Sequence, residues 1–294
     1  MTFKLRQKLT KWISQFCPKE LPLKHSEKED TLKLSENKLK WATPVFNENE
    51  QPHFLFIITP PYSGSTALSE LLNTSYRTMI LQERAEGQWL IPGLCEKDRW
   101  NQDKKVDYDS VKATWLSRFQ MVQRLTGNVD VVIEKSPPNM MRIEELASQF
   151  NSYSFIANNR NPYANCASIL YRQHDAKAIT SKQRKSILKD LTKKWMEKSQ
   201  RIRELIEKLN IPLLTYEDFC KKPSSVIDIL NLPKGVAESI NTEAKVKVKD
   251  YKPQKISNQN DRQISNLTPE EIKLISSILE SNTQLLEFFN YEVI

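Results

Sequence analysis

Two short loops of this chain carry residue types that bind oxyanions, and each follows an apolar run. In the first, residues 59–68, Gly64 precedes the hydroxyl residues Ser65 and Thr66 and a predicted helix. A helix amino terminus offers free backbone N–H groups and a positive dipole end, and glycine lets the backbone approach a ligand closely. This pattern predicts an anion site, unless Ser65 or Thr66 merely caps the helix.

The second loop contains Arg160, followed eight residues later by Ser168 on the next predicted helix. An arginine at a strand end can bind an oxyanion through two parallel hydrogen bonds. Ser168 lies about two turns into the helix, so it reaches the same anion only if the helix passes across it. The alternative is a surface arginine and an unrelated serine.

The first loop differs from a nucleoside triphosphate loop. That loop needs a lysine directly after its last glycine, and no lysine follows Gly64. The apolar run at 129–133 ends in Glu134 and Lys135, where a magnesium-binding strand carries aspartate. The sequence therefore predicts a phosphate-like ligand that is bound without a metal.

Five apolar runs predict five strands, at residues 53–58, 78–82, 129–133, 153–157 and 211–216. Helical patterns alternate with them, including a stripe that stops at Gly127, further helices near 139–149, 163–173 and 184–209, and a last helix that starts with the capping box at Thr268. This alternation predicts a parallel sheet covered by helices on both faces, with ligands at the carboxyl ends of the strands.

Composition limits the partners and the compartment. The chain has 294 residues with a formal charge of +8, which suits an anionic partner or reflects solubility alone. Its four cysteines form no CxxC pair, and we find neither a membrane-length apolar run nor a secretory signal. We therefore expect free thiols and a cytoplasmic protein.

Residues 1–52 differ from the rest and predict an amphipathic helix and an arm, followed by one domain at 53–294. Apolar residues recur at helical spacing among basic ones within residues 3–16. This segment either contacts an anionic membrane surface peripherally or packs against its own domain.

Five segments resemble the sulfotransferase superfamily, whose donor is 3′-phosphoadenylyl sulfate. TPPYSGSTAL (59–68) resembles the family's 5′-phosphosulfate loop, and RNPYANCAS (160–168) resembles its 3′-phosphate motif. VIEKSP (132–137) is similar to a stretch of the carbohydrate members, and AEGQWLIP (85–92) and LTYEDF (214–219) also match family segments. The resemblance covers roughly residues 53–231.

The resemblance implies a P-loop-like three-layer fold with a five-stranded parallel sheet, in which the first, third and fourth strands are adjacent. It implies that Arg160 and Ser168 hold the 3′-phosphate and that no metal takes part. Adenosine 3′,5′-bisphosphate would be the product, and the EKSP stretch favours a sugar or another small alcohol as acceptor. The 5′-phosphosulfate would be held by Tyr62, Ser63, Gly64, Ser65, Thr66 and Ala67.

Two positions depart from the family pattern. Tyr62 stands where the family has lysine or arginine, so it offers one neutral hydrogen bond and no charge, and Lys135 is the candidate replacement. Ser136 stands where cytosolic members have their catalytic histidine, so we expect a carboxylate to act as general base. Glu86 matches best, with Glu83 and Glu134 as alternatives.

The sequence leaves three other functions open. The chain could be a metal-dependent nucleotide kinase with a similar sheet, or a binding protein that keeps the donor pocket without catalysis. It could also bind polyanions or membrane surfaces through its basic arm. Nucleic acid is the least favoured partner, because the sequence carries no base-reading or stacking motif.

Overall fold

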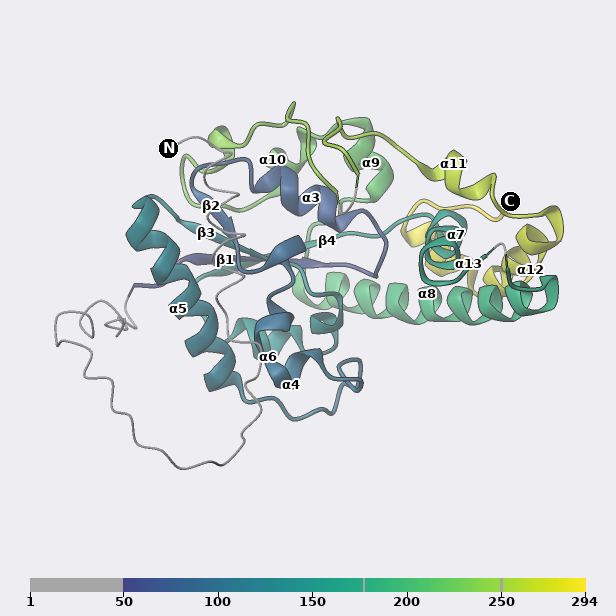
Figure 1. The fold of residues 1–294 in the computed structure, drawn as a ribbon, viewed down its shortest axis with the longest axis horizontal. Coiled ribbons are helices and arrows are strands. Elements are labelled where there is room, and N and C mark those ends of the chain that lie inside the picture. The colour runs from purple at the N-terminus through teal and green to yellow at the C-terminus, as the bar shows by residue number, and fades with distance from the viewer. Residues whose placement is uncertain (1–49, 177, 249–250) are drawn as a thin grey trace, which may run out of the picture.

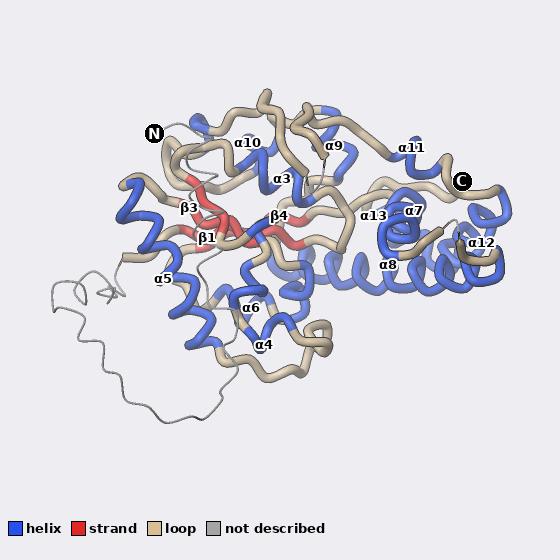
Figure 2. Tube along the Cα trace, viewed as in Figure 1, coloured by secondary structure: helices blue, strands red, loops and turns tan. Residues whose placement is uncertain are grey.

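The computed structural model describes residues 50–176, 178–248 and 251–294. The predicted amphipathic segment at 3–16 and nearly all of the predicted arm lie outside the described residues. Figures 1 and 2 show the described part as a short sheet between helices, with a long helix beneath it.

A parallel sheet of four strands forms the centre of the fold, in the order β2-β3-β1-β4. Its strands are β1 (His53–Ile58), β2 (Thr78–Ile80), β3 (Val131–Glu134) and β4 (Tyr153–Ala157). β1 pairs with β3 on one side and with β4 on the other, as the resemblance implied. The ends of these three strands are therefore neighbours, and the loops after them meet at one edge of the sheet.

The prediction of a fifth strand at 211–216 is wrong. Only Leu213 forms a bridge, with Ala157 of β4. Pro212 has no N–H to donate to a ladder. Three residues further on, the Thr215 side chain accepts a hydrogen bond from the Asp218 backbone and starts a helix at Tyr216. The segment therefore stays hydrogen-bonded beside β4, with Leu214 N donating to the Ala157 oxygen and Tyr216 N to the Asn159 oxygen, but it forms a single bridge and no strand.

Helices cover both faces of the sheet (Figures 1 and 2). One face carries α3 (Ser65–Leu72), α9 (Tyr216–Lys221) and α10 (Ser225–Ile229). The other side carries α4 (Pro92–Cys95), α5 (Tyr108–Thr126), α6 (Ile143–Ala147), α7 (Pro162–Gln173), α8 (Ser181–Leu209), α12 (Pro269–Leu279) and α13 (Thr283–Phe288). The remaining elements are η1 (Glu83–Ala85), η2 (Gly87–Leu90), η3 (Pro137–Met141), η4 (Ala237–Ser239), α11 (Asn260–Ile264) and η5 (Glu280–Asn282).

The alternation of β1 side chains explains the two buried cores. Phe54 and Phe56 point into a core shared with α5 and α8. Leu55 and Ile57 point into the opposite core, with α3, α9 and α10. A strand that is buried on both faces has a continuous run of apolar residues, and this pattern predicted β1.

Most predicted helices form, and their ends follow local signals. α5 ends at Gly127, which has a φ of 74°, and α12 begins with a complete capping box between Thr268 and Glu271. The helix predicted near 139–149 is instead broken into η3 and α6. The break falls at Arg142, whose guanidinium donates to the backbone oxygens of Arg99 and Asn101.

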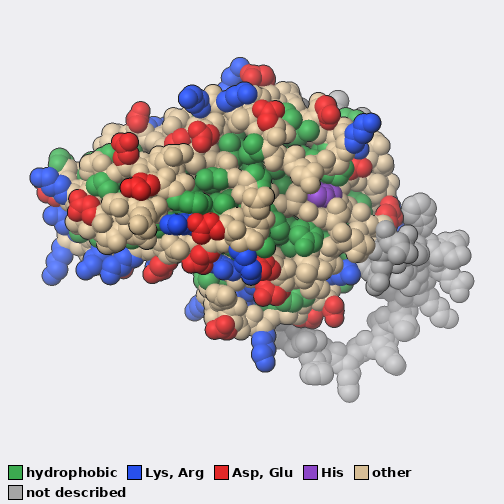
Figure 3. Space-filling view, turned by 180° about the vertical axis from the view of Figure 1, so that it is seen from behind, with side chains coloured by type: hydrophobic (Ala, Val, Ile, Leu, Met, Phe, Trp, Pro, Cys, Tyr) green, Lys and Arg blue, Asp and Glu red, His purple; other side chains and the backbone are tan. Residues whose placement is uncertain are grey.

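Charge is unevenly spread over the surface. Figure 3 shows lysine and arginine side chains gathered at the left of the lower edge, the region that α8 and α12 occupy at the right of Figure 1.

Within the described residues, no helix combines the length and the apolar character that a membrane crossing requires.

Candidate functional site

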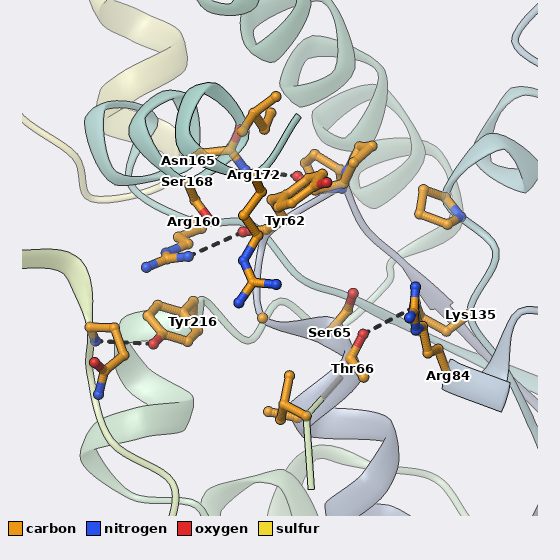
Figure 4. Close-up of a pocket in the computed structure, with 18 of the residues that line it drawn as sticks. Tyr62, Ser65, Thr66, Arg84, Lys135, Arg160, Asn165, Ser168, Arg172 and Tyr216 are labelled. Atoms are coloured by element: carbon orange, nitrogen blue, oxygen red, sulfur yellow. Dashed lines mark hydrogen bonds between the residues drawn. The ribbon is translucent and has the colours of Figure 1, made fainter. Parts of the chain in front are cut away.

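A cavity of about 500 Å³ opens at the carboxyl ends of the strands, within the range of about 300–1,000 Å³ that ligand pockets occupy. It collects residues from both predicted anion loops and from the end of β3 (Figure 4). Every residue predicted for the site lines it except Ser63: Tyr62, Gly64, Ser65, Thr66, Ala67, Glu86, Lys135, Arg160 and Ser168.

Gly64 is the residue that turns the first loop into α3. Its φ is 81°, in the region that favours glycine, and no side chain caps the helix. The ring of Tyr216 lies so close that a Cβ on Gly64 would come within 2.3 Å of it. The loop therefore presents the uncapped start of α3 to the cavity, and a helix start of this kind offers backbone N–H groups to an anion.

Arg160 enters the cavity from the tip of β4. Its side chain is only 6% exposed, and its guanidinium lies 4.3 Å from the Tyr216 ring centroid. Nε donates to the Asn260 side chain of α11 at 2.9 Å, whereas Nη2 has no partner among the described residues. Burial lowers the pKa of Arg160, although the group stays cationic. An anion would satisfy the free N–H groups of Nη2.

The two loops touch each other. Arg160 Nη1 donates to the backbone oxygen of Tyr62 at 3.2 Å. Asn165 Nδ2 of α7 donates to the backbone oxygen of Pro61 at 2.8 Å and to the Ser63 hydroxyl at 3.2 Å. Ser63 is fully buried, so its hydroxyl holds the loop against α7 and does not face the cavity.

Ser168 and Arg172 project into the cavity from the same side of α7 (Figure 4). Arg160 and Ser168 line the same cavity, which is the arrangement that an anion shared by the two would require. Arg172 follows Ser168 by four residues, and its guanidinium lies 4.8 Å from the Tyr251 ring centroid.

The end of β3 holds the Glu86 segment in place through three hydrogen bonds. Lys135 N donates to the Ala85 oxygen at 2.7 Å, and Gln88 N donates to the Ser136 hydroxyl at 3.1 Å. The Gly87 N–H donates to the Glu134 carboxylate at 2.8 Å. These bonds turn the side chain of Glu86 toward that of Lys135.

Glu86 and Lys135 form an ion pair, with 3.0 Å between Lys135 Nζ and Glu86 Oε1. Lys135 is 2% exposed and also donates to the Thr66 hydroxyl at 3.4 Å, so it links the first loop to Glu86. Burial lowers the pKa of Lys135. Burial alone would raise the pKa of Glu86, but Lys135 and hydrogen bonds from Trp89 and Gln88 outweigh it and hold that pKa below its usual value.

The other candidates for a general base lie elsewhere. Glu134 is fully buried and accepts hydrogen bonds from Gly87 and Asn139, and burial raises its pKa to about 7. Glu83 is exposed and does not line the cavity. His53 sits at the amino end of β1, bonded to Ser152 and Ser154, and His174 lies beyond α7 outside the cavity.

The cavity is strongly basic. Nine basic residues line it against the single carboxylate of Glu86: Arg84, Arg99, Lys135, Arg160, Arg172, Lys194, Lys198, Lys255 and Arg262. Of these nine residues, only Lys135 and Lys255 have ion-pair partners within the described ranges. Like charges this close repel one another, so the arrangement favours an anionic ligand.

Tyr62 and Arg84, which line the cavity, and Ala85, which adjoins them in the chain, have left-handed backbones that non-glycine residues rarely adopt. The φ angles are 65° at Tyr62, 64° at Arg84 and 58° at Ala85. Such conformations cost roughly 1–3 kcal/mol each and cluster at ligand sites. At Arg84 the strained backbone places a further cation beside Lys135 (Figure 4).

Several residues of the site were not singled out from the sequence, including Arg172, which lines the cavity, and Asn260, which binds Arg160 without lining the cavity. Arg172 had a usable signal, because it lies one turn beyond Ser168. Asn260 had no such signal, since the residue it binds lies 100 positions away.

No cluster of histidine, cysteine and carboxylate side chains suited to a metal occurs in the part of the chain that the structure describes. Its cysteines, Cys95, Cys166 and Cys220, are unpaired.

The model of a protein family described as "Sulfotransferase family" matches residues 52–230. This stretch contains all four strands and every predicted site residue. A search of curated protein sequences finds no match.

Solved structures of sulfotransferases are similar to this chain. A sulfotransferase domain from the curacin biosynthetic pathway has 17% identity and a TM-score of 0.46, covering 83% of this chain and 99% of that one. A sulfotransferase from Mycobacterium avium has 13% identity and a TM-score of 0.48, and the match covers 88% of this chain and 80% of that one. A sulfotransferase from Alicyclobacillus acidocaldarius has 12% identity and a TM-score of 0.44, and the match covers 83% of this chain and 97% of that one. The family assignment rests on the family model.

Gly64→Ala should destabilise the protein more than Gly127→Ala. Both glycines have positive φ, but a Cβ would collide with Tyr216 at Gly64 and meet open space at Gly127. We expect a loss of about 1 kcal/mol at Gly127 from strain and about 1–3 kcal/mol more at Gly64 from overpacking. Urea unfolding measures both, and equal losses would mean that the Tyr216 contact is unimportant.

Glu134→Gln should weaken the pH dependence of stability. The folded protein keeps the Glu134 proton up to a pKa of about 7, whereas the ordinary value is 4.5. The unfolded chain therefore releases the proton first, and stability falls as the pH rises from about 4.5 to 7. Glutamine cannot ionise, so the free energy of unfolding should drop less between pH 5 and pH 8 than in the wild type. An unchanged drop would contradict the raised pKa.

Proposed function

This chain belongs to the sulfotransferase family, and we propose that it transfers a sulfuryl group from 3′-phosphoadenylyl sulfate to a hydroxyl of a sugar or another small alcohol. The observation that carries the donor assignment is the buried Arg160 guanidinium, whose Nη2 is unpartnered, next to the uncapped start of α3. The two features suit two separate oxyanions of one ligand. We also infer that the sheet belongs to the P-loop-like class.

The 3′-phosphate belongs at Arg160. A buried guanidinium with an unused N–H pair costs free energy unless an anion compensates it. Ser168 adds a neutral donor from α7 on the same side of the cavity (Figure 4). A 3′-phosphate distinguishes this donor from ATP, so a dedicated cationic contact is what selectivity requires.

The 5′-phosphosulfate belongs at the start of α3. The residues that face the cavity there are Gly64, Ser65, Thr66 and Ala67. The N–H groups and hydroxyls of Ser65 and Thr66 supply neutral donors, whereas the Ala67 N–H already donates to the Gly64 oxygen. Ser63 supports this loop from behind through Asn165. Bound at these two places, the donor would supply the activated sulfuryl group.

Lys135 compensates for the missing charge at Tyr62. Tyr62 offers its backbone oxygen to Arg160 and its hydroxyl to Gln173. Lys135 instead donates to Thr66, a residue of the phosphosulfate loop. A phosphosulfate bound at this loop would bring its departing phosphate close to the Lys135 ammonium, and a fixed cation there would lower the barrier.

Glu86 acts as the general base. Its low pKa keeps it ionised at neutral pH, so it can accept the proton of the acceptor hydroxyl as the new oxygen–sulfur bond forms. The oxygen–sulfur bond to the phosphate breaks at the same sulfur, and the phosphate keeps that electron pair. Glu86 is 19% exposed, so the proton can then pass to solvent. Lys135 donates to both Glu86 and Thr66, so it holds the proposed base in a fixed position relative to the phosphosulfate loop.

Arg160→Met should weaken the binding of adenosine 3′,5′-bisphosphate by about 10- to 150-fold, since charge-assisted hydrogen bonds contribute about 1.5–3 kcal/mol. Binding of adenosine 5′-phosphate should change far less, because it lacks the 3′-phosphate. Calorimetric titration of both nucleotides gives the ratio.

The matched control is Arg203→Met, which lies on α8 in an ion pair outside the cavity. It should leave both affinities unchanged. If Arg160→Met weakens the binding of both nucleotides equally, the 3′-phosphate site is misplaced. If the wild-type protein binds magnesium ATP more tightly than adenosine 3′,5′-bisphosphate, the result favours a nucleotide kinase over the proposed function.

Glu86→Gln should lower kcat by about 10²- to 10⁴-fold, the usual contribution of a general base. The affinity for adenosine 3′,5′-bisphosphate should stay within about twofold, because the loop and Arg160 are intact. Glu83→Gln is the control, since Glu83 is exposed three residues earlier. Transfer of labelled sulfate measures both variants, and full activity of Glu86→Gln would place the base elsewhere.

A further inference from the structure

One wall of the cavity carries cations that the donor assignment leaves unused. Lys194 and Lys198 line it from α8, and Arg99 lines it from the segment after α4. In the described part of the chain, none of the three has an ion-pair partner. Arg160, Ser168 and the α3 start already account for both anionic ends of the donor.

The two lysines form a repulsive pair. Lys194 and Lys198 are four residues apart on one helix, so they share a face. Burial lowers the pKa of Lys198, and the nearby charge of Lys194 lowers it further. Lys198 is partly buried whereas Lys194 is exposed, so the repulsion acts on a desolvated charge at Lys198. A bound anion would relieve that cost.

Two indole rings accompany these cations and connect them to Glu86. Lys198 Nζ lies 4.7 Å from the Trp100 ring centroid, and the Arg99 guanidinium lies 5.1 Å from that of Trp89. Trp89 is 49% exposed, and its Nε1 donates to Glu86 at 2.8 Å. This wall therefore begins at the proposed general base.

We propose that the acceptor is an anionic ring alcohol, whose carboxylate, sulfate or phosphate group binds Lys194, Lys198 and Arg99 while its ring packs against Trp89 and Trp100. The assignment rests on the proposed function, because it takes Glu86 as the base that receives the acceptor proton. A ring with an apolar face suits the indoles, and an oxyanion suits three unpaired cations.

The test compares two probes that differ in one charged group, 4-nitrophenyl β-D-glucuronide and 4-nitrophenyl β-D-glucoside. Each is titrated calorimetrically into the full-length protein saturated with adenosine 3′,5′-bisphosphate. We expect the glucuronide to bind about tenfold tighter or more, as one charge-assisted contact predicts, with the preference falling as salt rises from 50 to 300 mM. The 6-phosphate of the glucoside, as a third probe, shows whether phosphate is preferred to carboxylate.

The double variant Lys194→Met and Lys198→Met should bring the preference for the glucuronide below about threefold while leaving bisphosphate binding unchanged. The control is Lys193→Met, an exposed lysine of α8 that does not line the cavity. Thermal melting verifies that each variant is folded.

The outcomes separate the two proposals. Equal binding of the two glycosides, binding of neither, or a preference that survives in the double variant overturns the anionic acceptor while the bisphosphate still binds. Failure of the wild-type protein to bind adenosine 3′,5′-bisphosphate overturns the proposed function instead.

Discussion

A single buried guanidinium joins the parts of the chain that make this cavity. Arg160 donates to the loop after β1 through Tyr62, donates to α11 through Asn260, and stacks on Tyr216 at the start of α9. A buried cation held by neutral groups is costly unless it also meets an anion. The cavity is therefore assembled around a charge that its own protein partners leave incompletely satisfied.

The opposite side of the cavity depends on a second constraint, the fixed position of residues 85–88 against the end of β3. The buried Glu134 carboxylate holds the Gly87 N–H, and a Cβ on Gly87 would lie 2.6 Å from that carboxylate. Left-handed backbones at Arg84 and Ala85 accompany this close approach. A strained turn thus brings Glu86 to Lys135, and Lys135 to Thr66. In the proposed transfer, a base and a cation held in this way would need little reorganisation.

The two sides of the cavity share an excess of positive charge. Positive side chains line it from α7, α8, the β3 end and the C-terminal segment, and Glu86 is the only acidic lining residue among those described. Such a field attracts anionic ligands. In the functions proposed above, the same electrostatic feature would serve the anionic donor, the anionic acceptor and the carboxylate that accepts the proton.

The sequence alone determined the elements and their tips, because these depend on local rules. Continuous apolar runs predicted β1 to β4, and glycine and capping residues predicted the ends of α5 and α12, since side-chain period and backbone freedom act over a few residues. The family resemblance then implied that the first and fourth strands are neighbours, and so that the Gly64 and Arg160 loops meet. Only the tertiary structure decided that residues 211–216 form one bridge instead of a strand, that Ser63 faces α7, and that Glu134 is a buried support. The same holds for Asn260 on Arg160 and for the wall of Arg99, Lys194 and Lys198. These outcomes depend on which distant side chains reach the same space, and no spacing along the chain encodes that distance.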